Sequence, residues 1–365
     1  MSNSIDRLFK ILIEQGGSDL HLTEGYPPKM RIHGGVSAIE GEPVMDREII
    51  NQYLEGICEE KSYGEYLEEG DLDFAYEMDI DSRFRCNYFK QQFGLGAIFR
   101  LIPTEIATIE QLGIPQVVKN FASIRAGLVL VTGPTGSGKS TTLAAIIDYI
   151  NENYSKHIIT VEEPIEFVHS NKKCIITQRE IPTHCASFSD GLRASLREDA
   201  EIVLVGEMRD LETISLALTA AETGMLVFGT LHTNNAVKTI DRIIDVFPAD
   251  QQAQVRTMLA ASIQGVLAQL LMKRCDTAGR VAVNEIMFTT PAVSAIIREG
   301  KTQKLNDVIT QGAELGMQFM DEAIWDKLQK GIVSPEEAYM KAIDKSRFKS
   351  FLPTALASLA NSSGG

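Results

Sequence analysis

The chain has 365 residues, which is enough for two or three domains, each with a hydrophobic core of its own. Hydrophobic residues make up 44% and charged residues 23%, a composition typical of a globular protein and not of a disordered or fibrous one. The formal net charge of −14 argues against a general nucleic-acid binder, because such proteins present basic surfaces to phosphate.

Cysteines and apolar segments indicate the compartment of the protein. The five cysteines are scattered without a CxxC pair, so neither a zinc site nor a disulfide framework is predicted. No apolar run reaches the roughly 18 residues that a membrane helix requires. In the opening residues 1–15, Arg7, Lys10 and Glu14 interrupt the apolar residues, which predicts an amphipathic helix and not a signal peptide. We therefore expect a cytoplasmic protein with reduced thiols.

Residues 1–105 are expected to form an α+β domain. After the opening helix, the strand-like segments SDLHL and MRIHG precede a helix around residues 46–60, and three further strands follow: DFAYEM, RFRCNYFKQ and GAIFRLIP. The segment RFRCNYFKQ alternates in polarity, so Arg83 and Arg85 point to one face of the sheet and the apolar residues between them to the other.

The remaining chain predicts an α/β architecture. Residues 106–120 contain glycine and proline and are expected to be a linker. From 121 to 290, apolar strands alternate with helices, the pattern of a parallel sheet. The predicted strands are GLVLVTG, HIITVEEP, EIVLVGE and MLVFGTLHT, and the predicted helices cover 139–151, 190–199, 211–224 and, as one long helix, 248–273. Residues 291–365 are expected to be mainly helical, with a frayed end at SLANSSGG.

The segment GPTGSGKS fits the phosphate-binding pattern G-x-x-x-x-G-K-[ST] in full, and it lies between a predicted strand and a predicted helix. Its glycines let successive backbone N–H groups face phosphate at the start of the helix. Lys139 would bind the β- and γ-phosphates, and Ser140 would bind Mg²⁺; the alternative is a glycine-rich turn with an exposed lysine. The predicted ATP-binding residues are Gly133, Pro134, Thr135, Gly136, Ser137, Gly138, Lys139, Ser140 and Thr141.

Two strand ends carry carboxylates. The strand EIVLVGE ends in Gly206-Glu207, where many nucleotide hydrolases have Asp-Glu with the Asp helping to hold Mg²⁺. Because ligands of open α/β sheets gather at the carboxyl ends of the strands, Glu207 is placed to orient the attacking water, and Glu162 or Glu163 after HIITV to contact the metal directly or through water. The alternatives are a solvated glutamate at the strand end and an acidic start of the following turn.

His232 ends a third strand at the same predicted edge. It could contact the γ-phosphate or only hydrogen-bond to the sheet edge. Arg193 and Arg197 share a face of the helix 190–199, and surface ion pairs are the simpler interpretation of both.

Five segments occur together in a characteristic order: GPTGSGKSTT, TVEEPIEF, GLRASLRED, VLVGEMRD and GTLHTN. In this order and spacing the chain resembles the type II/IV secretion ATPase superfamily, and within it the retraction ATPases of type IV pili. The resemblance implies a PAS-like N-terminal domain and a RecA-like P-loop NTPase domain, assembled into a homohexameric ring that uses ATP and Mg²⁺. It also implies that Glu207 is the catalytic base, since Gly-Glu is normal in the family, that Glu163 lies in an acidic box and His232 in a histidine box, and that Arg83 and Arg85 approach the nucleotide.

The resemblance further implies pilus retraction and twitching motility, with contacts to the pilus machinery and to a PilC-like platform protein of the inner membrane. The protein would then be cytoplasmic and peripheral at that membrane. Three departures from the family pattern are Glu163 where aspartate is commoner, Met225 where many relatives have histidine, and AVSAIIRE in a segment linked to retraction.

Other functions remain open from the sequence. An accessory (PilU-like) retraction ATPase is the nearest alternative. Extension and secretion ATPases usually carry a further N-terminal domain and a tetracysteine element, which this sequence does not show. A nucleic-acid translocase is disfavoured by the acidic balance, so no nucleic-acid partner is expected. A non-catalytic nucleotide-binding scaffold is disfavoured by the presence of Lys139 and Glu207.

Overall fold

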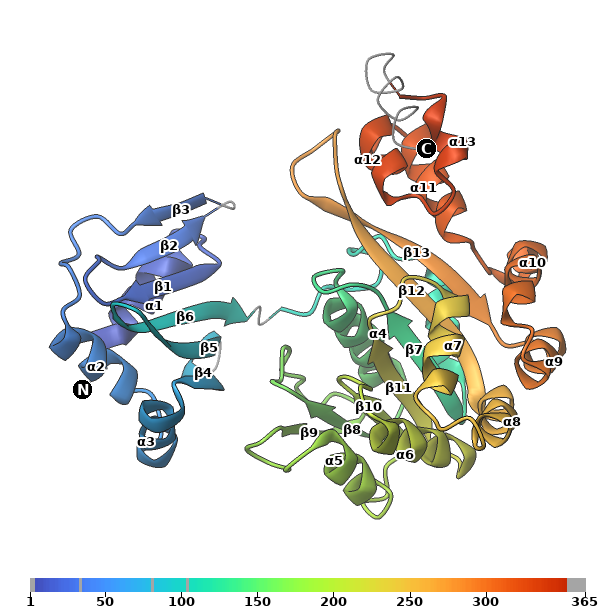
Figure 1. Ribbon diagram of the computed structural model, residues 1–365, viewed down its shortest axis with the longest axis horizontal. Helices are drawn as coiled ribbons and strands as arrows, with labels where there is room; N and C mark the ends of the chain where they lie inside the picture. The colour runs from blue at the N-terminus through green and yellow to red at the C-terminus, as the bar shows by residue number, and fades with distance from the viewer. Residues whose placement is uncertain (1–3, 33–34, 80–81, 103–104, 353–365) are drawn as a thin grey trace. The chain divides into compact units, whose positions relative to one another are not determined.

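The computed structural model describes residues 4–32, 35–79, 82–102 and 105–352 (Figure 1). These residues form two compact units. The first takes the chain up to Glu105 together with Pro164–Val168, and the second takes residues 106–163 and the chain from His169 onward.

The first unit is a six-stranded antiparallel sheet with three helices. Its strand order is β3-β2-β1-β6-β5-β4. The predicted helix around residues 46–60 is wrong in its extent, because the helix ends at Glu55 and a second helix begins at Glu60. The elements are α1 (Ser4–Glu14), β1 (Asp19–Thr23), β2 (Lys29–Ile32), β3 (Gly35–Ala38), α2 (Arg47–Glu55), α3 (Glu60–Glu69), β4 (Asp71–Asp79), β5 (Ser82–Gln91) and β6 (Gly94–Ile102).

The predicted alternation of β5 is confirmed. Phe84, Cys86 and Tyr88 are buried, and they share a core with α1, where Phe9 stacks on Phe84 with ring centroids 4.0 Å apart. Arg83 and Arg85 lie on the other face of the sheet, where they are partly exposed. The sheet therefore buries its apolar face under the helices and leaves its arginine-bearing face outside that core.

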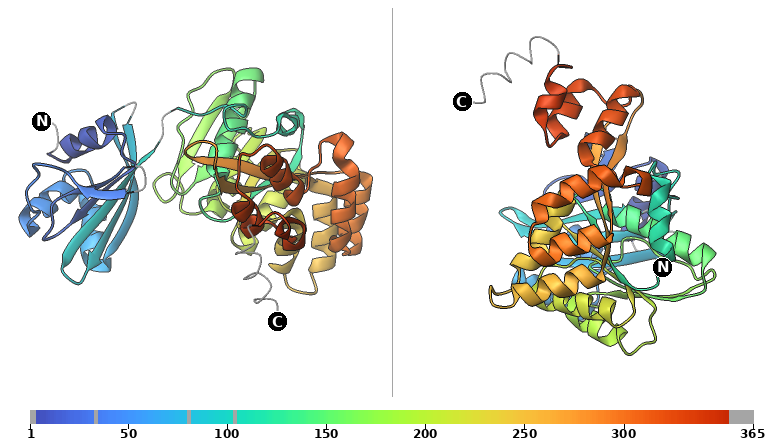
Figure 2. Two further views of the ribbon diagram at one scale, coloured as in Figure 1. Left: turned by 90° about the horizontal axis from the view of Figure 1, so that it is seen from above. Right: turned by 90° about the vertical axis from the view of Figure 1, so that its right-hand side faces the viewer.

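The second unit is built around a seven-stranded sheet with the order β13-β12-β7-β11-β10-β8-β9. All neighbouring strands are parallel except β12 and β13. Helices cover both faces (Figures 1 and 2), which confirms the predicted α/β class with a RecA-like arrangement. The strands are β7 (Gly127–Thr132), β8 (His157–Glu162), β9 (Ile175–Glu180), β10 (Ile202–Val205), β11 (Leu226–Leu231), β12 (Ile263–Lys273) and β13 (Arg280–Phe288).

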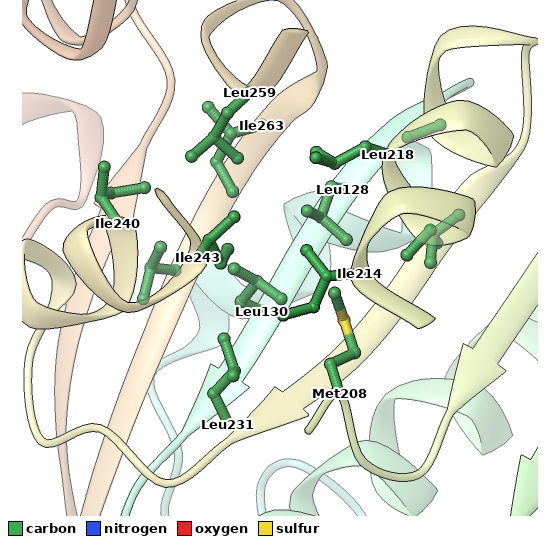
Figure 3. Packing of buried hydrophobic residues seen from close by; sticks show 14 of the residues in the cluster. Leu128, Leu130, Met208, Ile214, Leu218, Leu231, Ile240, Ile243, Leu259 and Ile263 are labelled. Carbon is green, nitrogen blue, oxygen red and sulfur yellow. The ribbon is translucent and has the colours of Figure 1, made fainter. Parts of the chain in front are cut away.

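Each face of this sheet has its own core because alternate residues of a strand point to opposite faces. On one face, Leu128 and Leu130 of β7 pack with α6, α7 and α8 (Figure 3). On the other, Val129 and Val131 pack with α4 and η1. The flanking helices are η1 (Gln116–Ser123), α4 (Lys139–Asn153), α5 (Phe188–Ser195), α6 (Leu211–Glu222), α7 (Ala236–Asp245) and α8 (Gln252–Ser262).

The prediction of one helix over 248–273 is wrong. Only α8 is helical, and β12 follows it directly, paired with β7 on one side and β13 on the other. A central strand that is buried on both faces is a continuous apolar run, and its hydrophobic spacing does not distinguish it from a buried helix. The helix predicted over 190–199 ends earlier, at Ser195.

The segment 106–120, for which we expected a linker, contributes Ile109, Ile114 and Val118 to the core of the second unit. After β13 the chain is mainly helical, as predicted, with α9 (Pro291–Glu299), α10 (Leu305–Gln311), α11 (Met320–Gln329), α12 (Pro335–Lys341) and α13 (Lys345–Lys349). The frayed end predicted at SLANSSGG lies outside the described residues.

All five cysteines are free thiols in the structure. Among the helices of the described ranges, none combines the length and the apolar character needed to cross a lipid bilayer.

Candidate functional site

Four predicted site segments lie at one edge of the second unit's sheet. The carboxyl ends of β7, β11, β10 and β8 lead into the glycine-rich loop, His232, Glu207 and Glu163 respectively. These strands are parallel and neighbours in that order, so their ends meet at the same edge. Only β11 separates β10 from β7, whereas β8 is one strand farther away. Of the two carboxylates, Glu207 thus follows the strand nearer to the loop.

The loop after β7 has a backbone that requires glycine. Gly133, Gly136 and Gly138 have φ angles of 150°, 75° and 84°, in the region that favours glycine over other residues. A Cβ atom at Gly133 would lie 2.3 Å from the backbone oxygen of Gln269 and 2.5 Å from Ser137 Oγ. These glycines therefore allow a tight loop that leads directly into α4.

The polar groups of this loop suit a phosphate chain. The N-terminus of α4 presents backbone N–H groups and the positive end of the helix dipole. Lys139 Nζ lies over the loop, 2.9 Å from the carbonyl oxygen of Gly133 and 3.2 Å from that of Pro134. Ser137 Oγ is buried and, within the described residues, has no hydrogen-bond partner. Ser140 is exposed in the first turn of α4, where its hydroxyl is accessible to a metal ion.

Glu207 is the best-defined carboxylate of the edge. Arg209 Nη2 donates to its Oε2 over 2.5 Å, and His232 Nε2 lies 3.0 Å from its Oε1. Burial raises the pKa of Glu207, but the hydrogen bonds and positive charges of Arg209 and His232 outweigh burial and hold the pKa below its ordinary value. The side chain is therefore an ionised proton acceptor at neutral pH. The structure thus joins two predicted residues, Glu207 and His232.

Gly206, which precedes Glu207, lies close to the backbone of β8. The N–H of Gly206 donates to the carbonyl oxygen of Val161 over 2.8 Å. A Cβ at Gly206 would lie 3.1 Å from that oxygen and 3.3 Å from Cα of Glu162. A Cβ at this position would require the adjacent backbone of β8 to shift by a few tenths of an ångström.

The residue after Glu207 fixes the turn. Met208 is buried beside Ile214 and Leu130 (Figure 3), and its N–H donates to the carbonyl oxygen of Thr230 over 3.0 Å. The hydroxyl of Thr230 in turn donates to the carbonyl oxygen of Gly206 over 2.5 Å. Packing and backbone hydrogen bonds therefore set the position of Glu207.

The two glutamates after β8 have different surroundings. Glu162 accepts hydrogen bonds from Thr160 and Gln178. Glu163 is exposed and lines a cavity of about 450 Å³ whose other acidic residues are Asp190, Asp210 and Glu212. Over the described ranges, no group of three or more His, Cys, Asp or Glu side chains is placed to hold a metal ion. A magnesium ion bound with nucleotide takes much of its coordination from phosphate and water oxygens, and Ser140 is the hydroxyl that fits this role.

The predicted arginines of the first unit occupy the sheet face opposite its helices. Arg85 lies directly opposite Arg100 in the β5–β6 pairing, and its Nε is 3.9 Å from Asp73 Oδ1. Arg100 Nε donates to Asp19 Oδ1 over 2.8 Å. Burial of Asp19 raises its pKa, but the hydrogen bonds from Ser18 and Arg100 outweigh burial and lower it.

In the second unit, Arg193 forms ion pairs with Asp190 and Glu212, as the surface interpretation expected.

Sequence reasoning missed three residues near the loop and Glu207. Arg209 was not singled out, although it stands two residues after Glu207. Gln269 was hidden within the wrongly predicted helix, and Arg280 within an unassigned segment. Gln269 and Arg280 line a cavity of about 330 Å³ together with Gly138, Thr141 and apolar residues.

A comparison with protein families matches residues 78–340 to the model for the Type II/IV secretion system protein family. The chain belongs to this family. It is 49% identical to the type IV pilus retraction ATPase PilT of Pseudomonas aeruginosa, over 93% of this chain and 98% of that protein. It is 47% identical to a twitching motility protein of Neisseria gonorrhoeae, over 86% of this chain and 84% of that protein.

The fold agrees with a solved member of the family. The crystal structure of the pilus retraction motor PilT with bound ADP aligns with a TM-score of 0.88 and 42% identity, and it covers 93% of this chain and 97% of that one. The resemblance that the sequence motifs predicted is therefore confirmed.

Proposed function

We propose that this chain is the ATPase motor of type IV pilus retraction, which converts ATP hydrolysis into removal of pilin subunits and so drives twitching motility. The observation that carries the proposal is the arrangement at one sheet edge of a complete phosphate-binding loop and an ionised glutamate held by Arg209 and His232. Its relatives over nearly the whole chain are a pilus retraction ATPase and a twitching motility protein.

The reaction is hydrolysis of ATP. Backbone N–H groups of the glycine-rich loop and the Lys139 ammonium hold the β- and γ-phosphates. A water oxygen attacks the γ-phosphorus, the bond to the oxygen that leaves with ADP breaks, and Glu207 takes the proton of the water. Ser140 and, directly or through water, Glu163 are the residues that would hold Mg²⁺, which when bound would neutralise charge on the phosphates.

Arg209 and His232 keep Glu207 ionised and oriented. His232 would additionally contact the γ-phosphate. The cavity of about 330 Å³ beside the loop, with Thr141, Arg280 and apolar residues in its wall, is where we place the ribose and base of the nucleotide.

The family resemblance supports a proposal for assembly and partners. We propose a homohexamer in which Arg83 and Arg85 approach the triphosphate of a neighbouring chain, because arginine binds phosphate through two parallel hydrogen bonds. The motor would act in the cytoplasm, at the inner membrane, on a PilC-like platform protein of the pilus machinery. An accessory (PilU-like) retraction ATPase is the alternative.

Deletion of the gene tests the proposal. Cells without the main retraction motor should accumulate surface pili, which are counted by electron microscopy, and should lose twitching. Loss of surface pili would instead identify an extension motor, and unchanged piliation with reduced twitching an accessory motor. DNA-stimulated ATPase activity of the purified protein would point to a nucleic-acid translocase.

A further inference from the structure

Gln269 is a buried amide in the centre of the apolar strand β12. The residue is 2% exposed, and a buried amide is costly unless its groups are hydrogen-bonded. Its Nε2 donates to the carbonyl oxygen of Ser137 over 2.7 Å, and its Oε1 accepts from Thr142 Oγ1 and from Asn284 Nδ2, both over 2.9 Å. One side chain therefore joins the phosphate loop, the first turn of α4 and β13.

These partners determine which way the amide points. The Ser137 carbonyl can only accept, so the amino group of Gln269 must face it. Asn284 supports this orientation with its amino group, while its own Oδ1 is buried and has no hydrogen-bond partner in the part of the chain that the structure describes. The network thus presents a fixed N–H donor to the loop.

The hydrogen bond to Ser137 has a geometric consequence for the next residue. A peptide unit is planar and trans, so its C=O and N–H groups point in opposite directions. Holding the Ser137 carbonyl against β12 directs the N–H of Gly138 away from β12. This N–H belongs to the loop whose backbone donors bind phosphate. The positive φ of Gly138, 84°, accompanies this peptide orientation.

We propose that Gln269 is a positioning residue for nucleotide binding, which sets the orientation of the Ser137–Gly138 peptide without contacting phosphate itself. The inference rests on the proposed nucleotide site. The backbone of Gln269 adds a second contact, because its carbonyl oxygen leaves no space for a side chain at Gly133. β12 therefore supports both ends of the loop.

The test compares Gln269→Leu and Gln269→Glu with the wild type, using Mg²⁺ and ADP as the probe and isothermal calorimetry as the measurement. Gln269→Leu should bind ADP about tenfold more weakly, the effect of leaving one buried carbonyl oxygen unsatisfied. Gln269→Glu should bind weakly at pH 8 and recover part of the loss at pH 6, because a protonated carboxyl can again donate to the Ser137 oxygen. Dividing the ADP affinity of each variant by that of the wild type at the same pH removes the effect of ADP protonation on the comparison.

Asn151→Asp is the matched control. Asn151, in α4, is also a buried amide, whose Nδ2 donates to the carbonyl oxygen of Ser170 over 2.8 Å and whose Oδ1 accepts from the N–H of Lys172 over 3.0 Å. This variant should unfold at a lower temperature without a pH-dependent change in relative ADP affinity.

ADP binding by Gln269→Leu as tight as that of the wild type would overturn the inference. An equal loss of ADP affinity in Gln269→Glu at pH 6 and pH 8 would also overturn it. This comparison is made within one variant, so it remains valid even if Gln269→Leu does not fold. Failure of the wild type to bind ADP would instead contradict the proposed nucleotide site.

Discussion

Replacing Glu207 by Gln separates its chemical role from its structural one. The amide has the size of the carboxylate, and its oxygen can still accept a hydrogen bond from Arg209. In the carboxylate, Arg209 Nε lies 2.5 Å from Oε1 and Arg209 Nη2 lies 2.5 Å from Oε2. Because an amino group takes the place of one of these oxygens, the variant loses one hydrogen bond to Arg209 and the negative charge, together with the proton acceptor. We expect unchanged ATP binding and much slower turnover.

The expected magnitude comes from two comparisons. General base catalysis typically contributes roughly 10²–10⁴ in rate, which corresponds to about 3–5 kcal/mol of activation free energy. The ion pair that is weakened involves Arg209, whose side chain is 66% exposed, and such pairs are worth about 1 kcal/mol or less. A loss of stability therefore cannot explain a loss of turnover by two orders of magnitude.

The assay is phosphate release at saturating Mg²⁺ and ATP, with ATP binding and thermal unfolding measured on the same preparations. Glu212→Gln is the matched control, because Glu212 is a carboxylate paired with the exposed Arg193 on the same unit. We expect its turnover to stay within about twofold of the wild type, as a surface ion pair allows. Turnover of Glu207→Gln within tenfold of the wild type would refute the role of Glu207 as base.

Four further predictions concern other residues. Lys139→Ala should abolish tight ATP binding and turnover, measured by calorimetry and phosphate release; full turnover would contradict the phosphate site. Glu163→Gln should lower activity in a way that raised Mg²⁺ partly restores, and a flat Mg²⁺ titration would exclude a role in holding the metal. Chains carrying both Arg83→Ala and Arg85→Ala are mixed in equal amounts with Lys139→Ala chains. If the arginines act across subunits, about one site in four combines an intact loop with intact arginines, and activity should partly return. If mass measurement shows mixed rings but activity does not return, the arginines act within their own chain. Burial raises the pKa of Glu285 to about 7, so between about pH 4.5 and 7 the folded state keeps a proton that the unfolded state has lost, and this group's stabilising contribution falls as pH rises through that range. In urea unfolding, the free energy of unfolding of the wild type minus that of Glu285→Gln should be larger at pH 5 than at pH 8. Equal values at the two pH values would contradict this prediction.

The parts of the site that could be predicted from the sequence are local. The glycine-rich loop, Glu207 and His232 each directly follow a short apolar strand, and the carboxyl ends of parallel strands share one edge of a sheet. Strand type and chain order were therefore sufficient to place them together. The two faces of β5 could be predicted for the same reason, because side chains alternate with a period of two.

The parts that were missed depend on partners distant in the sequence. β12 is buried between β7 and β13, and nothing within residues 263–273 distinguishes such a strand from a helix. The role of Gln269 could not be predicted for the same reason, since its hydrogen-bond partners Ser137 and Asn284 are known only from the fold. The pairing of Arg209 with Glu207 depends on a turn that is set by the burial of Met208.

Retraction of labelled pili in living cells tests the central claim most directly. The chromosomal gene is replaced by the Glu207→Gln variant, and individual fluorescent pili are followed over time beside cells carrying the wild type and Glu212→Gln. We expect pili that extend but do not retract in Glu207→Gln cells, with normal retraction in the other two strains. Retraction at the wild-type frequency in Glu207→Gln cells would contradict a motor powered by ATP hydrolysis at this site.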